Sequence, residues 1–174
     1  MDYRWKNYLV ASAILSLSGT FTFAETQWRL GVNLGSYHIE STEDFNELNP
    51  GAFVSVSFNT ENRLQYGFQL GGYSNSYSDR TLYGLGFVKY RIKNLEESEL
   101  FIGGFSGIFE YPNLVTQARS AGIPTVGDMV FIAGPLLTYR LKDGLDLTLG
   151  YIPFQGKETS GILTLQASIP FGGK

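Results

Sequence analysis

Apolar and polar residues alternate one by one over long parts of this chain, and this two-residue period constrains its fold most strongly. The alternation is clearest in two neighbouring stretches, 52–58 and 64–70, and the polar cluster 59–63 between them is typical of a turn. A strand places successive side chains on opposite faces, so each stretch predicts a strand with one apolar face. Together the two stretches predict an antiparallel hairpin.

Similar patterns recur along the chain and predict eight strands. The expected strands are 27–37, 52–58, 64–71, 81–93, 99–109, 128–141, 145–153 and 161–171. The phase of 99–109 stays open, and in 81–93 two candidate outward faces compete, which a bulge would reconcile. These two faces consist of Tyr83, Leu85 and Phe87, and of Val88, Tyr90 and Ile92.

The chain offers strands, and not a helix, for crossing a membrane. After Ala24 it contains no run of about 18 apolar residues, the length that a membrane-spanning helix needs. In lipid, only helices and closed barrels satisfy every backbone hydrogen-bonding group. We therefore predict an all-β fold, an eight-stranded antiparallel transmembrane β-barrel of the bacterial outer membrane. A soluble secreted β-sandwich, which would also alternate, is the alternative.

Residues 1–24 predict a secretory signal peptide. Arg4 and Lys6 precede a mostly apolar stretch, and the small residues that frame Phe23 at 22–24 suit cleavage. The apolar stretch is short for the alternative, a retained membrane anchor. Residues 25–174 are then expected to form one barrel domain, exported to the outer membrane.

Charge and cysteine content narrow the range of partners. Removing Asp2, Arg4 and Lys6 from the 13 basic and 16 acidic residues leaves 11 and 15, a net charge of −4. This charge argues against nucleic acid as a partner. The chain contains no cysteine, so a disulfide scaffold and a thiolate metal site are both excluded.

The only histidine, His38, ends the first expected strand, and Asn75 and Ser76 follow the third. A hairpin returns the chain to the side it left, so these residues share one rim of the barrel, whether or not they touch. The longer connections lie on this side, which places the rim outside the cell. His38 suits a general base near neutral pH, and an exposed loop histidine is the alternative. Ser76 suits a nucleophile or a hydrogen-bond donor, and a turn residue is its alternative.

Two groups of residues near the barrel wall and rim have two readings each. The loop after the first strand carries acidic residues that could orient His38 or meet divalent ions, or could simply be solvated. These residues are Glu40, Glu43, Asp44 and Glu47. Glycines on the inner face indicate a cavity wide enough for one small ligand, or else relieve bends in the strands. They are Gly31, Gly35, Gly67 and Gly71.

Pro135 and Pro153 fall in adjacent expected strands, 128–141 and 145–153. Proline cannot donate to a strand ladder, so pairing between these strands must open locally. Such an opening could give lipid lateral access to the barrel interior. For Pro153, the alternative is that the proline only marks the end of a strand.

These residues together resemble the outer-membrane lipid A palmitoyltransferases, the PagP family, over nearly the whole of 25–174, with sparse identities. The segments that carry the resemblance are His38, 45–51, Asn75-Ser76-Tyr77, Gly84-Leu85-Gly86, Gly134-Pro135 and Tyr151-Ile152-Pro153. In order, they resemble the family's catalytic histidine, its aromatic-Asn-Glu segment, its Asp-Ser pair with the following aromatic, its Gly-Tyr-Gly, and its proline-marked gap between two strands.

The resemblance implies transfer of an acyl chain, typically palmitoyl, from a phospholipid to the lipid A part of lipopolysaccharide, by a monomer without cofactor or metal. His38 would take the proton of the acceptor hydroxyl, and Ser76 and Asn75 would position the donor ester or stabilise its oxyanion. Gly84 and Gly86 would line the acyl pocket, with Gly86 setting the chain length unless it faces lipid. Pro135 and Pro153 would mark the lateral access.

The chain departs from the family at three points. Asn75 stands in place of an aspartate, the family's N-terminal amphipathic helix is missing, and Asn33 stands near a family proline. The first departure puts turnover in question, so two other classes remain open. One is a barrel that only binds lipid or is structural. The other is a barrel hydrolase such as a lipid A deacylase, although the late His-x-Ser-Asn signature of that family is missing after His38.

Overall fold

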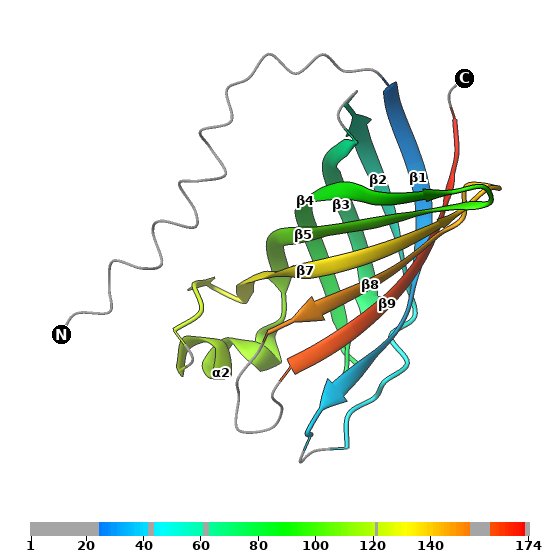
Figure 1. Cartoon of the computed structure of the whole chain (residues 1–174). Coiled ribbons are helices and arrows are strands. Elements are labelled where there is room, and N and C mark those ends of the chain that lie inside the picture. Colours follow the sequence, from blue (N-terminus) through cyan, green and yellow to red (C-terminus); the bar gives the residue numbers. More distant parts are fainter. Residues whose placement is uncertain (1–24, 42–43, 61–62, 121, 154–160, 173–174) are drawn as a thin grey trace.

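The chain is almost entirely β-strand in the part that the computed structural model describes, residues 25–41, 44–60, 63–120, 122–153 and 161–172 (Figure 1). The eight long strands are β1 (Glu25–Ile39), β2 (Gly51–Asn59), β3 (Leu64–Ser74), β4 (Arg80–Leu95), β5 (Ser98–Glu110), β7 (Met129–Leu141), β8 (Asp146–Ile152) and β9 (Gly161–Pro170). The connection after β5 holds η2 (Pro112–Leu114), α2 (Val115–Ser120) and the two-residue strand β6 (Thr125–Val126). No helix in these ranges is long and apolar enough to cross a membrane. The predicted signal peptide, 1–24, lies outside the described residues.

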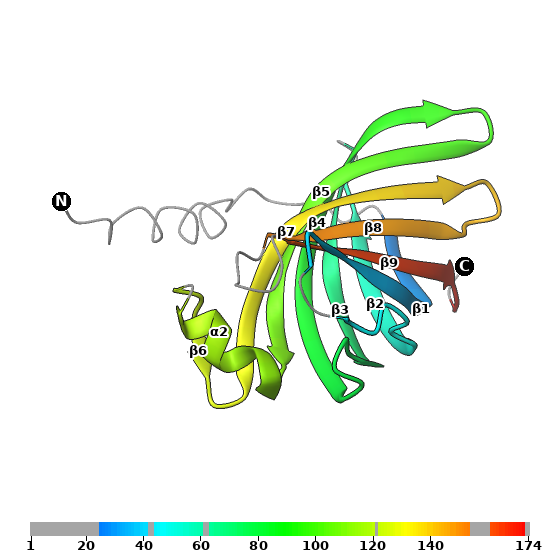
Figure 2. The same cartoon turned by 90° about the horizontal axis from the view of Figure 1, so that it is seen from below.

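The sheet closes on itself. Each long strand pairs antiparallel with its neighbours along the chain, β5 pairs directly with β7, and β1 pairs with β9. The strands curve around a common interior when the molecule is seen from below (Figure 2). The predicted eight-stranded antiparallel barrel is therefore confirmed, and every expected strand end lies within three residues of the observed one. The short strand β6, which pairs only with the start of β7, was not predicted.

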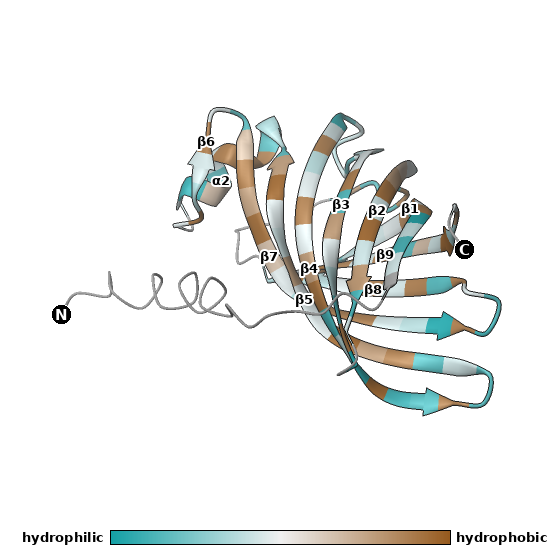
Figure 3. Ribbon diagram, turned by 90° about the horizontal axis from the view of Figure 1, so that it is seen from above, coloured by the Kyte–Doolittle hydropathy of each residue, from teal (hydrophilic) through white to brown (hydrophobic). Residues whose placement is uncertain are grey.

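The outer wall of the barrel is apolar. Exposed large hydrophobic side chains are found on every long strand except β2, for example Leu30 on β1, Phe68 on β3, Ile102 on β5 and Leu149 on β8. Apolar residues alternate with polar ones along the strands, and hydrophilic residues gather at strand ends (Figure 3). An outward apolar band on a closed barrel is the surface that faces lipid in a transmembrane barrel.

The inward side chains of β4 explain why its sequence pattern predicted two competing outward faces. Tyr83, Leu85 and Phe87 point inward and Val88 and Tyr90 point outward, in unbroken alternation. Both faces of this strand are apolar, so hydrophobicity could not decide between them. The bulge that would have reconciled the two sets is not where it was expected. The register shifts further along the strand, after Arg91.

A bulge in β1 turns His38 into the barrel. The β1–β9 register shifts between Asn33 and Gly35, so the extra residue Leu34 has no partner on β9. Strict alternation from Trp28 outward would have turned position 38 outward as well. After the bulge, Tyr37 is exposed and His38 is buried, because one extra residue exchanges the two faces of the strand beyond it.

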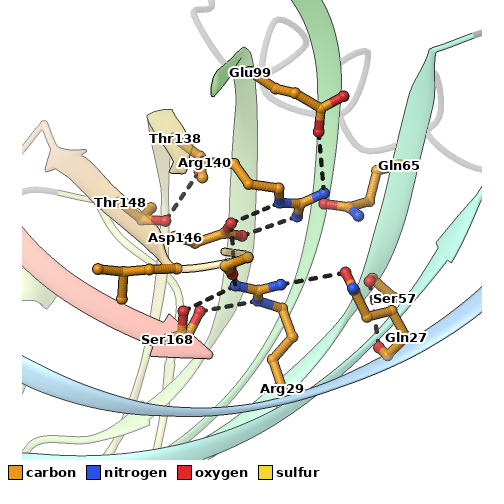
Figure 4. Close-up of polar contacts among 12 residues, drawn as sticks. Gln27, Arg29, Ser57, Gln65, Glu99, Thr138, Arg140, Asp146, Thr148 and Ser168 are labelled. Atoms are coloured by element: carbon orange, nitrogen blue, oxygen red, sulfur yellow. Dashed lines mark hydrogen bonds and ion pairs between the residues drawn. The ribbon is translucent and has the colours of Figure 1, made fainter. Parts of the chain in front are cut away.

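The interior has a charged end and an apolar end. At the end of the short turns, Asp146 accepts two hydrogen bonds from Arg140, at 2.6 and 2.9 Å, and lies 3.1 Å from Arg29 (Figure 4). Glu99 pairs with Arg91 at 2.5 Å and approaches Arg140 at 3.6 Å. Paired geometry of this kind offsets the cost of burying charge, so this network closes that end of the barrel.

The apolar end is covered by the connection after β5. Leu114 of η2 and Val115 and Ala118 of α2 are buried in one cluster with Phe109 of β5 and Val130 of β7. The segment is anchored by main-chain bonds, since Tyr111 N–H donates to Asp128 O at 2.8 Å. The longest connection of the barrel is thus a packed cap and not a loose loop.

Candidate lipid-binding cavity and rim site

A cavity of about 330 Å³ occupies the barrel interior. Its wall on β4, β5 and β7 is mostly apolar, with Leu85, Phe105 and Ile132 as examples. The opposite wall carries polar side chains such as Gln69 and Ser55. This volume lies in the range of small-molecule sites in proteins, and an apolar wall with a few polar groups is their usual chemistry.

The inward glycines do not form this space as expected. Side chains built on Gly31 or Gly71 would collide with Phe53, and one on Gly67 would collide with Phe87. The glycines therefore hold aromatic rings close to the wall. The cavity is the volume that remains between these rings. Gly35 lies beyond the β1 bulge, where an added side chain would meet the carbonyl of Glu47.

Gly84 and Gly86 do not line the cavity, and this part of the predicted acyl pocket is wrong. Side chains on these two residues would point towards Leu70 and Phe68, which face outward from β3. The register pairs Gly84 with Leu70 and Gly86 with Phe68. Since Leu85 between them points inward, the two glycines must face the lipid side, which is the outcome that the open strand phase had allowed.

His38 is buried at the loop end, with 5% of its surface exposed. Its ring stacks on Phe45, with 4.2 Å between the ring centroids, and Glu47 is the charged group that interacts with it. Among the described residues, its Nδ1 atom has no hydrogen-bond partner. An unpaired buried polar atom costs about 1–3 kcal/mol, so packing alone does not explain this histidine.

His38 also lies on a second hollow, open towards the loop surface. This hollow is lined by the described loop residues, including Ser41, Asp44 and Leu48. Glu43 lies outside the described residues. In the part of the chain that is described, no group of three or more histidine, cysteine or acidic residues could hold a metal ion.

Asn75 organises the turn between β3 and β4. Its side-chain oxygen accepts hydrogen bonds from the N–H groups of Tyr77 and Asp79, at 2.9 and 3.0 Å. Its side-chain nitrogen donates to the hydroxyl of Thr81 at 3.1 Å, and the residue is fully buried. This is the local side-chain-to-backbone bonding for which asparagine is favoured in turns.

Ser76 lines the large cavity at its loop end, as does Tyr111. Burial raises the pKa of the Tyr111 hydroxyl, and hydrogen bonds to Ser76 oppose this effect. The carbonyl of Ser76 accepts a hydrogen bond from the N–H of Asn46 at 3.1 Å. Tyr111 was not singled out from the sequence, because it lies in a connection whose packed structure has no periodic signal.

The predicted catalytic residues share one end of the barrel but lie in separate compartments. His38 lines the outer hollow and Ser76 lines the cavity. The ring of Phe45 stacks on His38 and meets Tyr77, the neighbour of Ser76, edge-on with 5.5 Å between centroids. The segment 44–49 therefore forms the wall between the two compartments.

The hydrogen-bonded ladder between β7 and β8 ends beside the prolines, but the strands stay close there, because a side chain on Gly134 would collide with the carbonyl of Tyr151. Within the described residues this ladder has five pairs and ends at Leu136 and Gly150. The part of β7 from Met129 to Pro135 pairs with β5 but not with β8. Pro153 and Ala133, on the two sides of this seam, both line the cavity. By contrast, the β1–β9 ladder continues to Ile39, so that seam is closed.

The closed ladders and the outward apolar band define a small transmembrane β-barrel with a capped internal cavity. No known protein-family model matches the chain, and no curated protein matches its sequence. Two solved structures with a similar course are Neisserial surface protein A (NspA) and the Yersinia pestis outer membrane protein Ail, in a phospholipid bilayer nanodisc. NspA is 10% identical, with a TM-score of 0.48 over 84% of this chain and 96% of its own. Ail is 10% identical, with a TM-score of 0.46 over 84% of this chain and 100% of its own.

Proposed function

We propose that this protein is an outer-membrane barrel that takes one acyl chain of a phospholipid into its cavity and transfers that chain to lipid A. The observation that carries the proposal is the cavity itself. It has an apolar wall, and its lining includes Ser76 and Tyr111 at the loop end and Ala133 and Pro153 where the β7–β8 ladder ends. Each buried methylene of an acyl chain contributes about 0.8 kcal/mol, so a cavity of this kind favours such a ligand.

The seam is the proposed way in for the donor. A phospholipid lies with its chains beside the apolar band, and in the described part of the chain β7 has no strand partner on this side from Ile132 to Pro135, since Met129 and Val130 pair with β6. Lateral access spares the lipid from leaving the membrane. The ester group of the donor would then lie near Ser76 at the cavity mouth, with the chain directed inward.

The outer hollow is the proposed acceptor site. A hydroxyl of lipid A placed there would meet His38, whose buried Nδ1 is available to take its proton. The acceptor oxygen would form the new ester bond to the acyl carbonyl carbon. The glycerol oxygen of the donor would leave and recover the proton. Ser76 would hold the carbonyl oxygen as charge develops on it. Asn75 would act through the turn that positions Ser76.

This reaction requires the wall between the two compartments to move. Phe45 covers His38, so its ring must shift before the donor carbonyl and the acceptor hydroxyl can meet. The acidic side chains Asp44 and Glu47 belong to the same segment. Movement of 44–49 would thus couple binding of the acceptor to opening of the site.

The mass of lipid A in cells that express the protein tests the proposal. We expect the wild type to add the mass of one acyl chain, and His38→Ala to abolish this gain while the barrel stays folded. Tyr37→Phe is the matched control, because Tyr37 is the neighbouring residue but faces outward. An unchanged lipid A mass with wild-type protein would contradict acyl transfer, and a loss of mass would indicate a hydrolase instead.

A second candidate is a barrel that binds an acyl chain without transferring it. The separation of His38 from Ser76 by Phe45 favours this candidate, as does the full use of the Asn75 side chain inside its own turn. The same experiment distinguishes the two, because a binding protein would retain phospholipid through purification but would leave lipid A unchanged.

A further inference from the structure

The cavity has a cationic side chain at its charged end that forms no ion pair with the described residues. Lys89 on β4 points inward, is only 8% exposed and lines the cavity. Its Nζ atom lies 4.9 Å from the centroid of the Phe87 ring, which also lines the cavity. Among the described residues, no carboxylate lies within ion-pair distance of this nitrogen.

The charge balance around Lys89 explains why it has no partner. Four cationic side chains share this end of the interior with two carboxylates. The cations are Arg29, Lys89, Arg91 and Arg140, and the carboxylates are Glu99 and Asp146. The three arginines occupy both carboxylates. Burying a charge without a partner is strongly unfavourable, so a site of this composition attracts an anion from outside the protein.

The surroundings of Lys89 suit the head of an amphiphile. Gln65 lies opposite Lys89 in the β3–β4 ladder and Ser57 lies on β2, and both line the cavity with it. Towards the loop end, Phe87, Leu85 and Phe105 continue the lining as an apolar surface. One end of the cavity is therefore cationic and polar, and its extension is apolar.

We propose that the cavity binds a single-chain amphiphilic anion, a long-chain carboxylate, with its head group paired to Lys89 and its chain directed towards the capped loop end. This site goes beyond the acyl transfer proposed above. A phospholipid chain that enters with its methyl end first would bring that methyl to Lys89 and leave the ammonium unpaired. An inorganic anion would leave the apolar wall uncovered. A single-chain carboxylate satisfies both parts of the cavity.

Binding of palmitate and of hexadecanol to the barrel in lipid nanodiscs tests the site. The two ligands have the same chain length and differ in the charge of the head group. We expect Lys89→Met to weaken palmitate binding at least about thirtyfold, as when one partner of a buried charge pair is removed. Hexadecanol binding should be unchanged or tighter, and Lys89→Arg should retain binding of palmitate.

Lys142→Met serves as the matched control, because Lys142 is an exposed lysine in the turn before β8. It should bind palmitate like the wild type. The shift in electrophoretic mobility on heating shows that each variant is folded. Equal affinity of wild type and Lys89→Met for palmitate would overturn the proposal, and so would a parallel loss for both ligands. Palmitate binding is read without any acceptor, so failure of acyl transfer to lipid A leaves this result independent.

Discussion

The arginine–carboxylate network at the turn end and His38 at the loop end are buried polar groups that differ in how they are satisfied. At the turn end, Asp146 and Glu99 are shared among three arginines, and these groups satisfy one another. At the loop end, His38 keeps a buried nitrogen without a partner among the described residues. Groups that fix a fold are expected to be satisfied internally, whereas groups that act on a ligand keep bonding capacity in reserve.

Removing Asp146 should break the paired end of the interior. Asp146→Ala leaves Arg29 and Arg140 buried without their shared carboxylate, and we expect a loss of about 3–5 kcal/mol in the free energy of unfolding. Urea titration of the barrel in phospholipid vesicles measures it. Glu97→Ala is the control, since Glu97 forms an exposed pair with Lys142 that should contribute under about 1 kcal/mol. Similar losses in both variants would remove the distinction between the two ends.

Replacing His38 should affect chemistry more than stability. If His38 is the general base, His38→Ala should lower acyl transfer by at least about a hundredfold. The free energy of unfolding should fall by only about 0.5–1.5 kcal/mol, the contribution of its stacking on Phe45. Lipid A mass and urea titration measure the two effects separately. A variant that transfers at the wild-type rate would return His38 to a structural role.

Two substitutions of Asn75 separate turn stability from acid chemistry. Asn75→Ala removes the acceptor of two backbone N–H groups and should cost about 1–3 kcal/mol. Asn75→Asp keeps an acceptor for both N–H groups, and the Thr81 hydroxyl can donate to the second oxygen. We expect Asn75→Asp to fold like the wild type and to increase acyl transfer, as measured by lipid A mass. A stable but slower Asn75→Asp barrel would count against an acid at this position.

The smallest effect is expected at Gly86, which faces lipid. Gly86→Met should leave the preference for acyl chain length unchanged, because the added side chain points out over Phe68. Leu85→Trp, one residue away on the inner face, should fill the cavity and shift the preference towards shorter chains. Phospholipids of graded chain length compare the two variants. A shift caused by Gly86→Met would mean that this strand has the opposite phase.

The fold could be predicted from sequence because a closed barrel repeats one simple rule on every strand. Alternation identified all eight long strands, including the β3 hairpin with Gln65 and Gln69 on its inner face. The rule failed on β4, where Tyr83 and Phe87 make the inner face as apolar as the outer. It also missed η2 and α2, since a short cap that packs on a cavity has neither strand nor long-helix periodicity.

The site was less predictable because its geometry depends on local departures from that rule. Topology brought His38 and Ser76 to one rim, but only the bulge at Leu34 determines which way His38 points. The intervening position of Phe45 follows from the path of a loop, which a residue pattern does not encode. Lys89 could not be placed inside the barrel because the phase of β4 was not assigned. The number of charged side chains inside the barrel could therefore not be predicted from the sequence.

The short β7–β8 ladder also affects where the barrel wall opens transiently. Local opening begins where the fewest backbone bonds hold two elements together, and within the described residues this ladder has five pairs against 13 between β5 and β7. Amide protons of β8 should therefore exchange with solvent deuterium sooner than those of β5. A lipid chain could then enter without a permanent gap between β7 and β8. The ladder would open transiently from Leu136 towards the turn, and its closure would retain the chain.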